Sequence, residues 1–176
     1  MADDNVKVWT TVGSAGTLNQ ADLAKVSLHQ SIIQLGSELT TTTGPSVAAP
    51  VPGGVLQSTI QAVVRYNITP VDGLFLTGHF KYALQVRFRN HITAKLMEAD
   101  IETGAEKQLL LLDSQSFPSN PNFQVQTVVP KTDSTVMDFV NKSYYVEATL
   151  IAPSVAVGHP AEISIIKVIA TPDFNG

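Results

Sequence analysis

The chain of 176 residues is 44% hydrophobic and only 15% charged, with a formal net charge of -4 and no cysteine. This length suits one globular domain over residues 1–176, which buries about two thirds of the surface of the unfolded chain. The absence of cysteine excludes disulfides and thiolate metal sites, and the 11 Lys and Arg residues are spread along the sequence without the basic patch that binds nucleic acid.

The first residues predict a strand or arm over 1–12, in which Val6, Val8 and Thr10 alternate around Trp9. The start of the chain lacks the basic and apolar regions of a secretory signal, and no run approaches the roughly 18 apolar residues of a membrane span. We therefore expect a soluble protein with no cleavable signal peptide and no membrane span. The sequence does not indicate a cellular compartment.

Residues 18–35 fit two structures. Thr17 and Gln20 form a capping-box pattern, and a glycine follows at the far end of the segment, as in a helix. Apolar residues at period two, many of them β-branched, instead indicate a strand over 25–35. The favoured interpretation is at most one short helix near residues 18–24, followed by that strand, and the longer helix remains the alternative.

A long irregular segment covers residues 36–58 and is rich in Thr, Pro and Gly. This composition favours extended backbone over packing on its own core. A compact domain rarely carries such a loop without a use for it. We expect the segment to pack either against a neighbouring subunit or across the surface of its own domain.

Alternation of apolar and polar residues at period two recurs through the rest of the chain, as expected for strands with one buried face. Strands are predicted over residues 59–69, 81–89, 92–101, 107–113, 123–129, 144–150 and 162–170. The third and fourth of these are predicted to form a hairpin, because Gly104 can adopt the positive φ of a tight turn with little strain. About eight or nine strands without crossover helices predict an all-β fold, an antiparallel β-sandwich of jelly-roll type.

Patterns typical of catalysis or metal binding are missing from the sequence. The four histidines lie at spacings that no zinc helix or finger uses: His29, His79, His91 and His159. The segment Gly13-Ser14-Ala15-Gly16 lacks the spacing of a serine nucleophile elbow, and there is no phosphate-binding glycine loop. We therefore expect no enzyme activity, no bound metal and no cofactor.

Acidic residues gather around the predicted hairpin, at Glu98, Asp100, Glu102 and Glu106. Four carboxylates in one place are compatible with calcium binding or with a carboxylate pair for glycoside hydrolysis. A solvated hairpin tip is the simpler interpretation and the favoured one.

A possible interaction surface follows from outward-facing cations and from aromatic residues outside the apolar faces. Three arginines are expected on one sheet surface, where they meet an anion or an acidic partner, or pair across strands with Glu98 or Glu147. Three aromatic residues are expected to be the plausible exposed platforms: Trp9, Phe75 and Tyr145. The candidate surface consists of Trp9, Arg65, Arg87, Arg89 and Tyr145.

Two functions fit these observations. The low charge and the many β-branched residues favour a non-enzymatic structural protein that assembles with other copies of itself, since monomers usually protect strand edges with charge. The alternative is a module that binds carbohydrate or another ligand, through loops at one end of the sandwich or a shallow sheet face.

Overall fold

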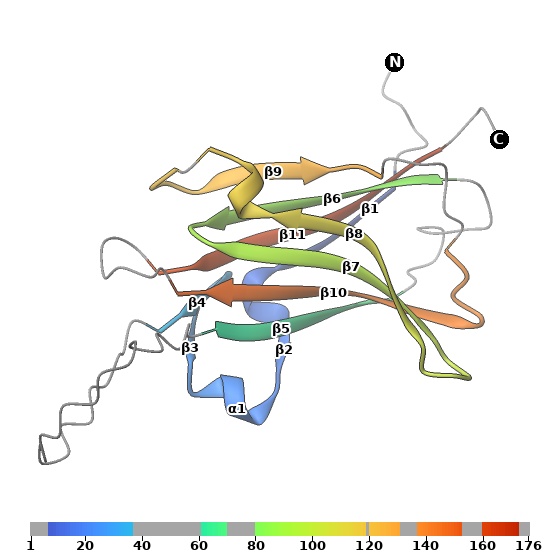
Figure 1. Ribbon diagram of the computed structural model, residues 1–176, viewed down its shortest axis with the longest axis horizontal. Coiled ribbons are helices and arrows are strands. Elements are labelled where there is room, and N and C mark those ends of the chain that lie inside the picture. The colour runs from blue at the N-terminus through green and yellow to red at the C-terminus, as the bar shows by residue number, and fades with distance from the viewer. Residues whose placement is uncertain are drawn as a thin grey trace, which may run out of the picture.

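The computed structural model describes residues 7–36, 61–69, 80–118, 120–130, 137–152 and 160–172. Two antiparallel sheets face each other in this part of the chain, which confirms the predicted all-β sandwich (Figure 1). The loop predicted over 36–58 lies outside the described residues apart from Gly36. Among the helices described, none has the length and apolar character needed to cross a membrane.

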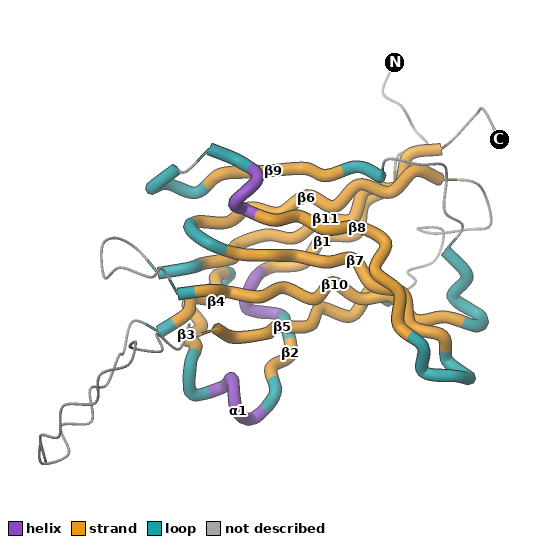
Figure 2. Tube along the Cα trace, viewed as in Figure 1, coloured by secondary structure: helices purple, strands orange, loops and turns teal. Residues whose placement is uncertain are grey.

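Strands dominate the described elements, and Figure 2 shows the few helical turns among them. In chain order the elements are β1 (Lys7–Val12), η1 (Gly13–Ala15), β2 (Thr17–Leu18), α1 (Gln20–Leu23), β3 (Val26–His29), β4 (Ile32–Leu35), β5 (Gln61–Ile68), β6 (Phe80–Arg89), β7 (Ile92–Asp100), β8 (Glu106–Asp113), η2 (Ser114–Ser116), β9 (Gln124–Val128), β10 (Lys142–Ile151) and β11 (Glu162–Pro172). The structure contains more strands than the sequence predicts. The two-residue strand β2 is too short to show in the sequence pattern, and β3 and β4 stand where one strand is predicted.

The sheets pair strands that are far apart in sequence. Sheet A has the order β3-β4-β11-β6-β9, with β1 also paired to β11, and sheet B has the order β2-β5-β10-β7-β8. The pairs are nested: β4 lies beside β11, β5 beside β10, β6 beside β9 and β7 beside β8. The second half of the chain therefore folds back along the first half, and the hairpin of β7 and β8 closes the end.

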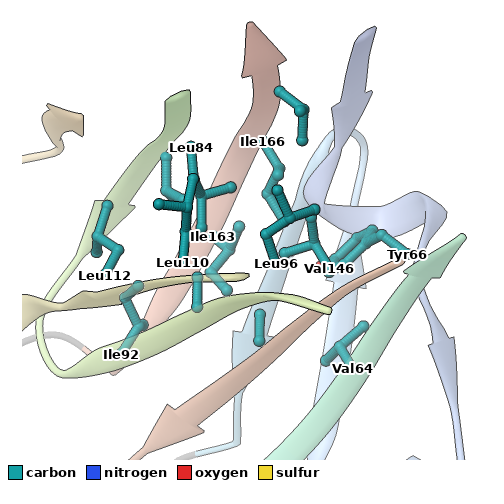
Figure 3. Close-up of a cluster of buried hydrophobic side chains, with 14 of the residues drawn as sticks. Val64, Tyr66, Leu84, Ile92, Leu96, Leu110, Leu112, Val146, Ile163 and Ile166 are labelled. Atoms are coloured by element: carbon teal, nitrogen blue, oxygen red, sulfur yellow. The ribbon is translucent and has the colours of Figure 1, made fainter. Parts of the chain in front are cut away.

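The core lies between the two sheets and is built from every second residue of the long strands (Figure 3). Ala62, Val64, Tyr66 and Ile68 of β5 all point inward, as the alternation predicts. The same holds for β6, where the buried residues are Tyr82, Leu84, Val86 and Phe88. In β5 and β6 the apolar side of the alternation is therefore the covered side.

The segment between β2 and β4 resolves the two structures left open for residues 18–35. A short helix, α1, is present, and its N-cap is Asn19, whose side-chain oxygen accepts a hydrogen bond from the Asp22 amide at 2.8 Å, in place of the expected Thr17 cap. The single strand expected over 25–35 is wrong. The chain reverses after His29, where Gln30 adopts a φ of +51°, so that β3 pairs with β4.

Candidate functional site

The three candidate arginines do not share one surface. Arg65 lies on β5 in sheet B, whereas Arg87 and Arg89 lie on β6 in sheet A, so they face opposite sides of the sandwich. The expectation of one cationic sheet surface is therefore wrong. Alternation places a residue on a face of its own strand but does not say which sheet the strand joins.

Of the three aromatic candidates, Phe75 lies outside the described residues, and the other two are not exposed platforms. Trp9 is only 9% exposed and belongs to the core, because β1 pairs with β11 and turns the indole inward. Tyr145 is 6% exposed although it lies on the outer side of β10, where the Arg65 guanidinium stands 4.9 Å from the centre of its ring. Burial of both residues corrects the expected aromatic surface.

The outer face of sheet B carries a row of alternating charges across three strands. Glu147 on β10 accepts a hydrogen bond from Nε of Arg65 at 3.1 Å, and its other oxygen lies 3.6 Å from Nζ of Lys95 on β7. This confirms the expected pairing of Arg65 with Glu147. A hollow of about 490 Å³ lies beside the row and is lined by Thr17, Leu18, Asn19, Val63, Arg65 and Glu147. The charges that line the hollow already neutralise one another.

The Tyr145 hydroxyl is buried, and within the described part of the chain it has no hydrogen-bond partner. Burial raises the pKa of Tyr145 to about 12, and the nearby carboxylates of Glu106 and Glu147 act in the same direction, against Arg65. Glu106 is therefore close, although it does not reach hydrogen-bonding geometry with the phenol. The hydroxyl therefore stays protonated at neutral pH.

The outer face of sheet A has a different character, with apolar side chains in cross-strand rows. One row runs Val12, Ile165, Arg87 and Val125 across β1, β11, β6 and β9. A second apolar row contains Val8, Ile169 and Ala83, and the row between the two is polar, with Thr10, Lys167, Gln85 and Thr127. Val125 is 53% exposed and Val8 is 40% exposed. We call this surface the apolar face.

No described helix covers the apolar face, because α1 lies beside β2 and β5 at the edge of the sandwich (Figure 1). Among the described residues, Arg89 of this face is paired with a carboxylate, whereas Arg87 and Lys167 are not. Arg87 donates a hydrogen bond to the Ser164 hydroxyl at 2.9 Å and stacks 4.4 Å from the Phe123 ring centre, and Lys167 has no described carboxylate partner. The carboxylate that is present, Glu162, accepts a hydrogen bond from Arg89 at 2.8 Å. The face therefore combines exposed aliphatic groups with positive charge.

Two of the four acidic residues, Asp100 and Glu102, lie at the turn between β7 and β8, whereas Glu98 is buried on β7, where its carboxylate accepts a hydrogen bond from Nζ of Lys142 at 2.7 Å. Asp100 accepts hydrogen bonds from the Thr103 amide at 2.8 Å and from the Thr103 hydroxyl at 2.9 Å, and these bonds lower the pKa of Asp100. Ile101 beside it is 60% exposed, and its amide donates to Asn141, next to Val140, which is 84% exposed. We call Asp100, Ile101, Glu102, Asp138 and Val140 the acidic tip. In the described residues no group of three metal-ligating side chains occurs here or elsewhere.

A cleft of about 370 Å³ is lined by segments that lie at the other end of the sandwich from the acidic tip, as the course of the chain in Figure 2 shows. Three separate segments form it: the turn between β6 and β7, η2 with the residue after it, and the loop that leads into β9. Its lining consists of Asn90, His91, Ser114, Gln115, Phe117, Asn120 and Gln124. We call this the end cleft.

Side-chain hydrogen bonds to the backbone hold the walls of the end cleft. Asn90, with a φ of +61°, donates to the Pro160 carbonyl at 3.0 Å, which fixes the β6–β7 turn. The Ser114 hydroxyl accepts from the Ile92 amide at 3.0 Å, and Asp113 accepts from the Gln115 amide at 2.9 Å. The cleft is therefore shaped by the chain itself, which lowers the cost of ordering it around a ligand.

The residues of the end cleft were not among the predicted site residues. Asn90 and His91 were recognisable as a turn, and residues 114–121 as a polar loop, but their convergence depends on the pairing of β6 with β9. Comparison with known proteins does not add to this list of sites, because no protein-family model matches the chain and no curated protein matches it either.

Proposed function

We propose that this protein is a non-enzymatic structural subunit that assembles with other copies of itself. The observation that carries the proposal is the apolar face, where exposed valines of β1 and β9 lie in rows with half-buried isoleucines of β11. Apolar side chains gathered on one exposed sheet surface are typical of contacts between proteins. Burial against a second subunit removes this surface from water.

The strand order supports a jelly-roll topology for the subunit. In the eight strands from β4 to β11, the first pairs with the last, the second with the seventh, the third with the sixth and the fourth with the fifth. Jelly rolls of this kind form capsid and lectin domains. Because a fold hosts many functions, the surface of the molecule and not its topology carries the proposal.

The acidic tip of a second copy is the partner that best complements the apolar face. The face presents aliphatic groups with the cations Arg87 and Lys167, and the tip presents Ile101 and Val140 among carboxylates. Apolar groups meet apolar groups in this contact, and opposite charges come together. Because two different surfaces meet, the contact is head-to-tail and builds closed rings, shells or filaments.

Light scattering over a concentration series from about 10 µM to 1 mM tests the proposal. We expect the mass to rise above the 18.8 kDa of one chain, and we expect Lys167→Glu or Glu102→Lys alone to return it to the monomer. The double variant, which carries both Lys167→Glu and Glu102→Lys, again has opposite charges on the two surfaces and should recover part of the assembly. Added salt should weaken the contact, since rim charges are screened.

The matched control is Lys107→Glu, which reverses an exposed lysine on sheet B outside the apolar face and should leave the mass unchanged. Circular dichroism checks that each variant keeps its β structure. A wild-type monomer at the highest concentration overturns assembly. An assembly that survives both single reversals overturns the contact between face and tip.

A further inference from the structure

We propose that the end cleft binds a neutral saccharide, a function separate from self-assembly. The cleft has a volume of about 370 Å³, within the range of small-molecule sites, and the segments that line it lie at the opposite end of the sandwich from the acidic tip. A ligand in it therefore leaves the acidic tip accessible.

The chemistry of the lining points to a ligand rich in hydroxyl groups. Six of the seven lining residues carry an amide, a hydroxyl or an imidazole, and none is an aspartate, glutamate, lysine or arginine. A site without fixed charges has nothing to neutralise a phosphate, a carboxylate or an ammonium group. Amides and hydroxyls both donate and accept, which matches the hydroxyl groups of a sugar.

Several of these groups have unused hydrogen-bonding capacity. Within the described residues, the side chains of His91 and Gln115 make no hydrogen bond at all. The Gln124 carbonyl oxygen accepts from Gln126 at 3.2 Å, and the Asn120 oxygen accepts from the Asn122 amide at 2.9 Å, so each keeps its NH₂ group for a ligand. Donors and acceptors are thus available on three walls of the cleft.

Phe117 supplies the apolar wall. It is half-buried and packs against the core, so its ring is held in place while part of it lines the cleft. A pyranose ring has a face of C–H groups that packs on an aromatic ring, as its hydroxyl groups point outward to polar partners. One aromatic wall among neutral polar groups therefore suits a sugar ring.

NMR titration of the isotope-labelled protein with the methyl glycosides of glucose, galactose, mannose and N-acetylglucosamine tests the proposal. We expect at least one glycoside to shift the amide signals of residues 90–91 and 114–124, with a dissociation constant on the order of 1 mM, as ligands of this size allow. Gln115→Ala, at an exposed position, should weaken binding about tenfold by removing hydrogen bonds. Phe117→Leu keeps an apolar side chain in the core but should weaken binding by removing the ring.

The matched control is Gln108→Ala, which removes the same side chain from an exposed position on β8 outside the cleft and should leave the dissociation constant unchanged. The proposal fails if no glycoside shifts these signals at about 50 mM. It also fails if Gln115→Ala binds as well as the wild type, or if phosphate or acetate binds in the cleft and the glycosides do not.

Discussion

Asp22 shows how one buried carboxylate joins the N-terminal segment to the sandwich. Its Oδ1 accepts a hydrogen bond from Nζ of Lys25 at 2.6 Å, and its Oδ2 accepts from Nδ2 of Asn19 at 2.9 Å and from the Val63 amide of β5 at 3.2 Å. Asp22 is only 5% exposed, so these bonds replace most of the hydration of its carboxylate. The helix α1, which is too short to be stable alone, is thereby fixed to the edge of sheet B.

The hydrogen bond from Lys25 is the main cause that lowers the pKa of Asp22 below its usual value. A carboxyl group with a lowered folded-state pKa stabilises the protein above its unfolded pKa of about 3.9, and this contribution is lost as the pH falls through the lower folded value. We therefore expect Asp22→Asn to reduce the free energy of unfolding by about 1–3 kcal/mol at pH 7 and by less near pH 3. Urea denaturation at both pH values measures the difference.

Glu102→Gln is the control for Asp22→Asn, since it neutralises an exposed carboxylate whose side chain makes no described contact. It should change the stability little at either pH. An equal loss for Asp22→Asn at pH 7 and near pH 3 would show that shape and not charge explains the role of Asp22.

At the scale of single elements, the hairpin of β3 and β4 depends on a turn residue, Gln30, whose type does not predict a turn. Gln30 has a φ of +51° in a two-residue loop, a conformation that usually requires glycine, asparagine or aspartate. A positive φ strains the backbone of Gln30, and its side chain is exposed. Gln30→Gly should therefore raise the free energy of unfolding by about 0.5 kcal/mol. The shift of the urea midpoint measures it.

Ser31→Gly tests the same loop at a position without positive φ. Glycine there only adds freedom to the unfolded chain, so it should lower the free energy of unfolding by about 0.5–1 kcal/mol. Equal effects of the two glycines would contradict strain at Gln30.

The elements also show what the sequence does and does not predict. The strands with one buried face follow directly from alternation, and Gly104, with a φ of +69°, marks the β7–β8 turn as expected. Strand β9 does not follow the rule that the apolar side of a strand is the buried side. Its apolar side, with Val125 exposed, points to solvent, while Gln124 and Gln126 on its other side are half-buried. Periodicity finds the two sides of a strand, but only the pairing decides which side is covered.

The same limit explains the candidate site. Arg65 and Arg87 have equivalent patterns in the sequence yet lie in different sheets, and Trp9 becomes a core residue once β1 pairs with β11. The end cleft combines segments that meet only because β6 lies beside β9. Residue type and spacing thus predict the strands, whereas the site depends on contacts between residues far apart in sequence.

At the scale of the whole molecule, the two sheets are joined early in the chain by η1, between β1 of sheet A and β2 of sheet B. The Tyr66 hydroxyl, on β5 of sheet B, donates a hydrogen bond to the Gly13 carbonyl at 2.8 Å. On the other side, η1 contacts β11 and β4 of sheet A. The segment Gly13-Ser14-Ala15-Gly16 is therefore a packed bridge between the sheets, rather than a loose turn.

Gly13 leaves no room for a side chain in this bridge. A Cβ atom there would lie 2.0 Å from the Ile163 carbonyl oxygen and 3.1 Å from the Ile33 amide nitrogen, both backbone atoms of sheet A. Gly13→Ala must therefore move one sheet relative to the other, and we expect it to lower the free energy of unfolding by about 2–3 kcal/mol.

Ala15→Ser, at an exposed position in the same turn, is the control and should change the stability little. Urea unfolding followed by circular dichroism and by Trp9 fluorescence measures both variants. Because the bridge belongs to both sheets, the two signals should shift together for Gly13→Ala, and a shift confined to the fluorescence would mean that only β1 is loosened.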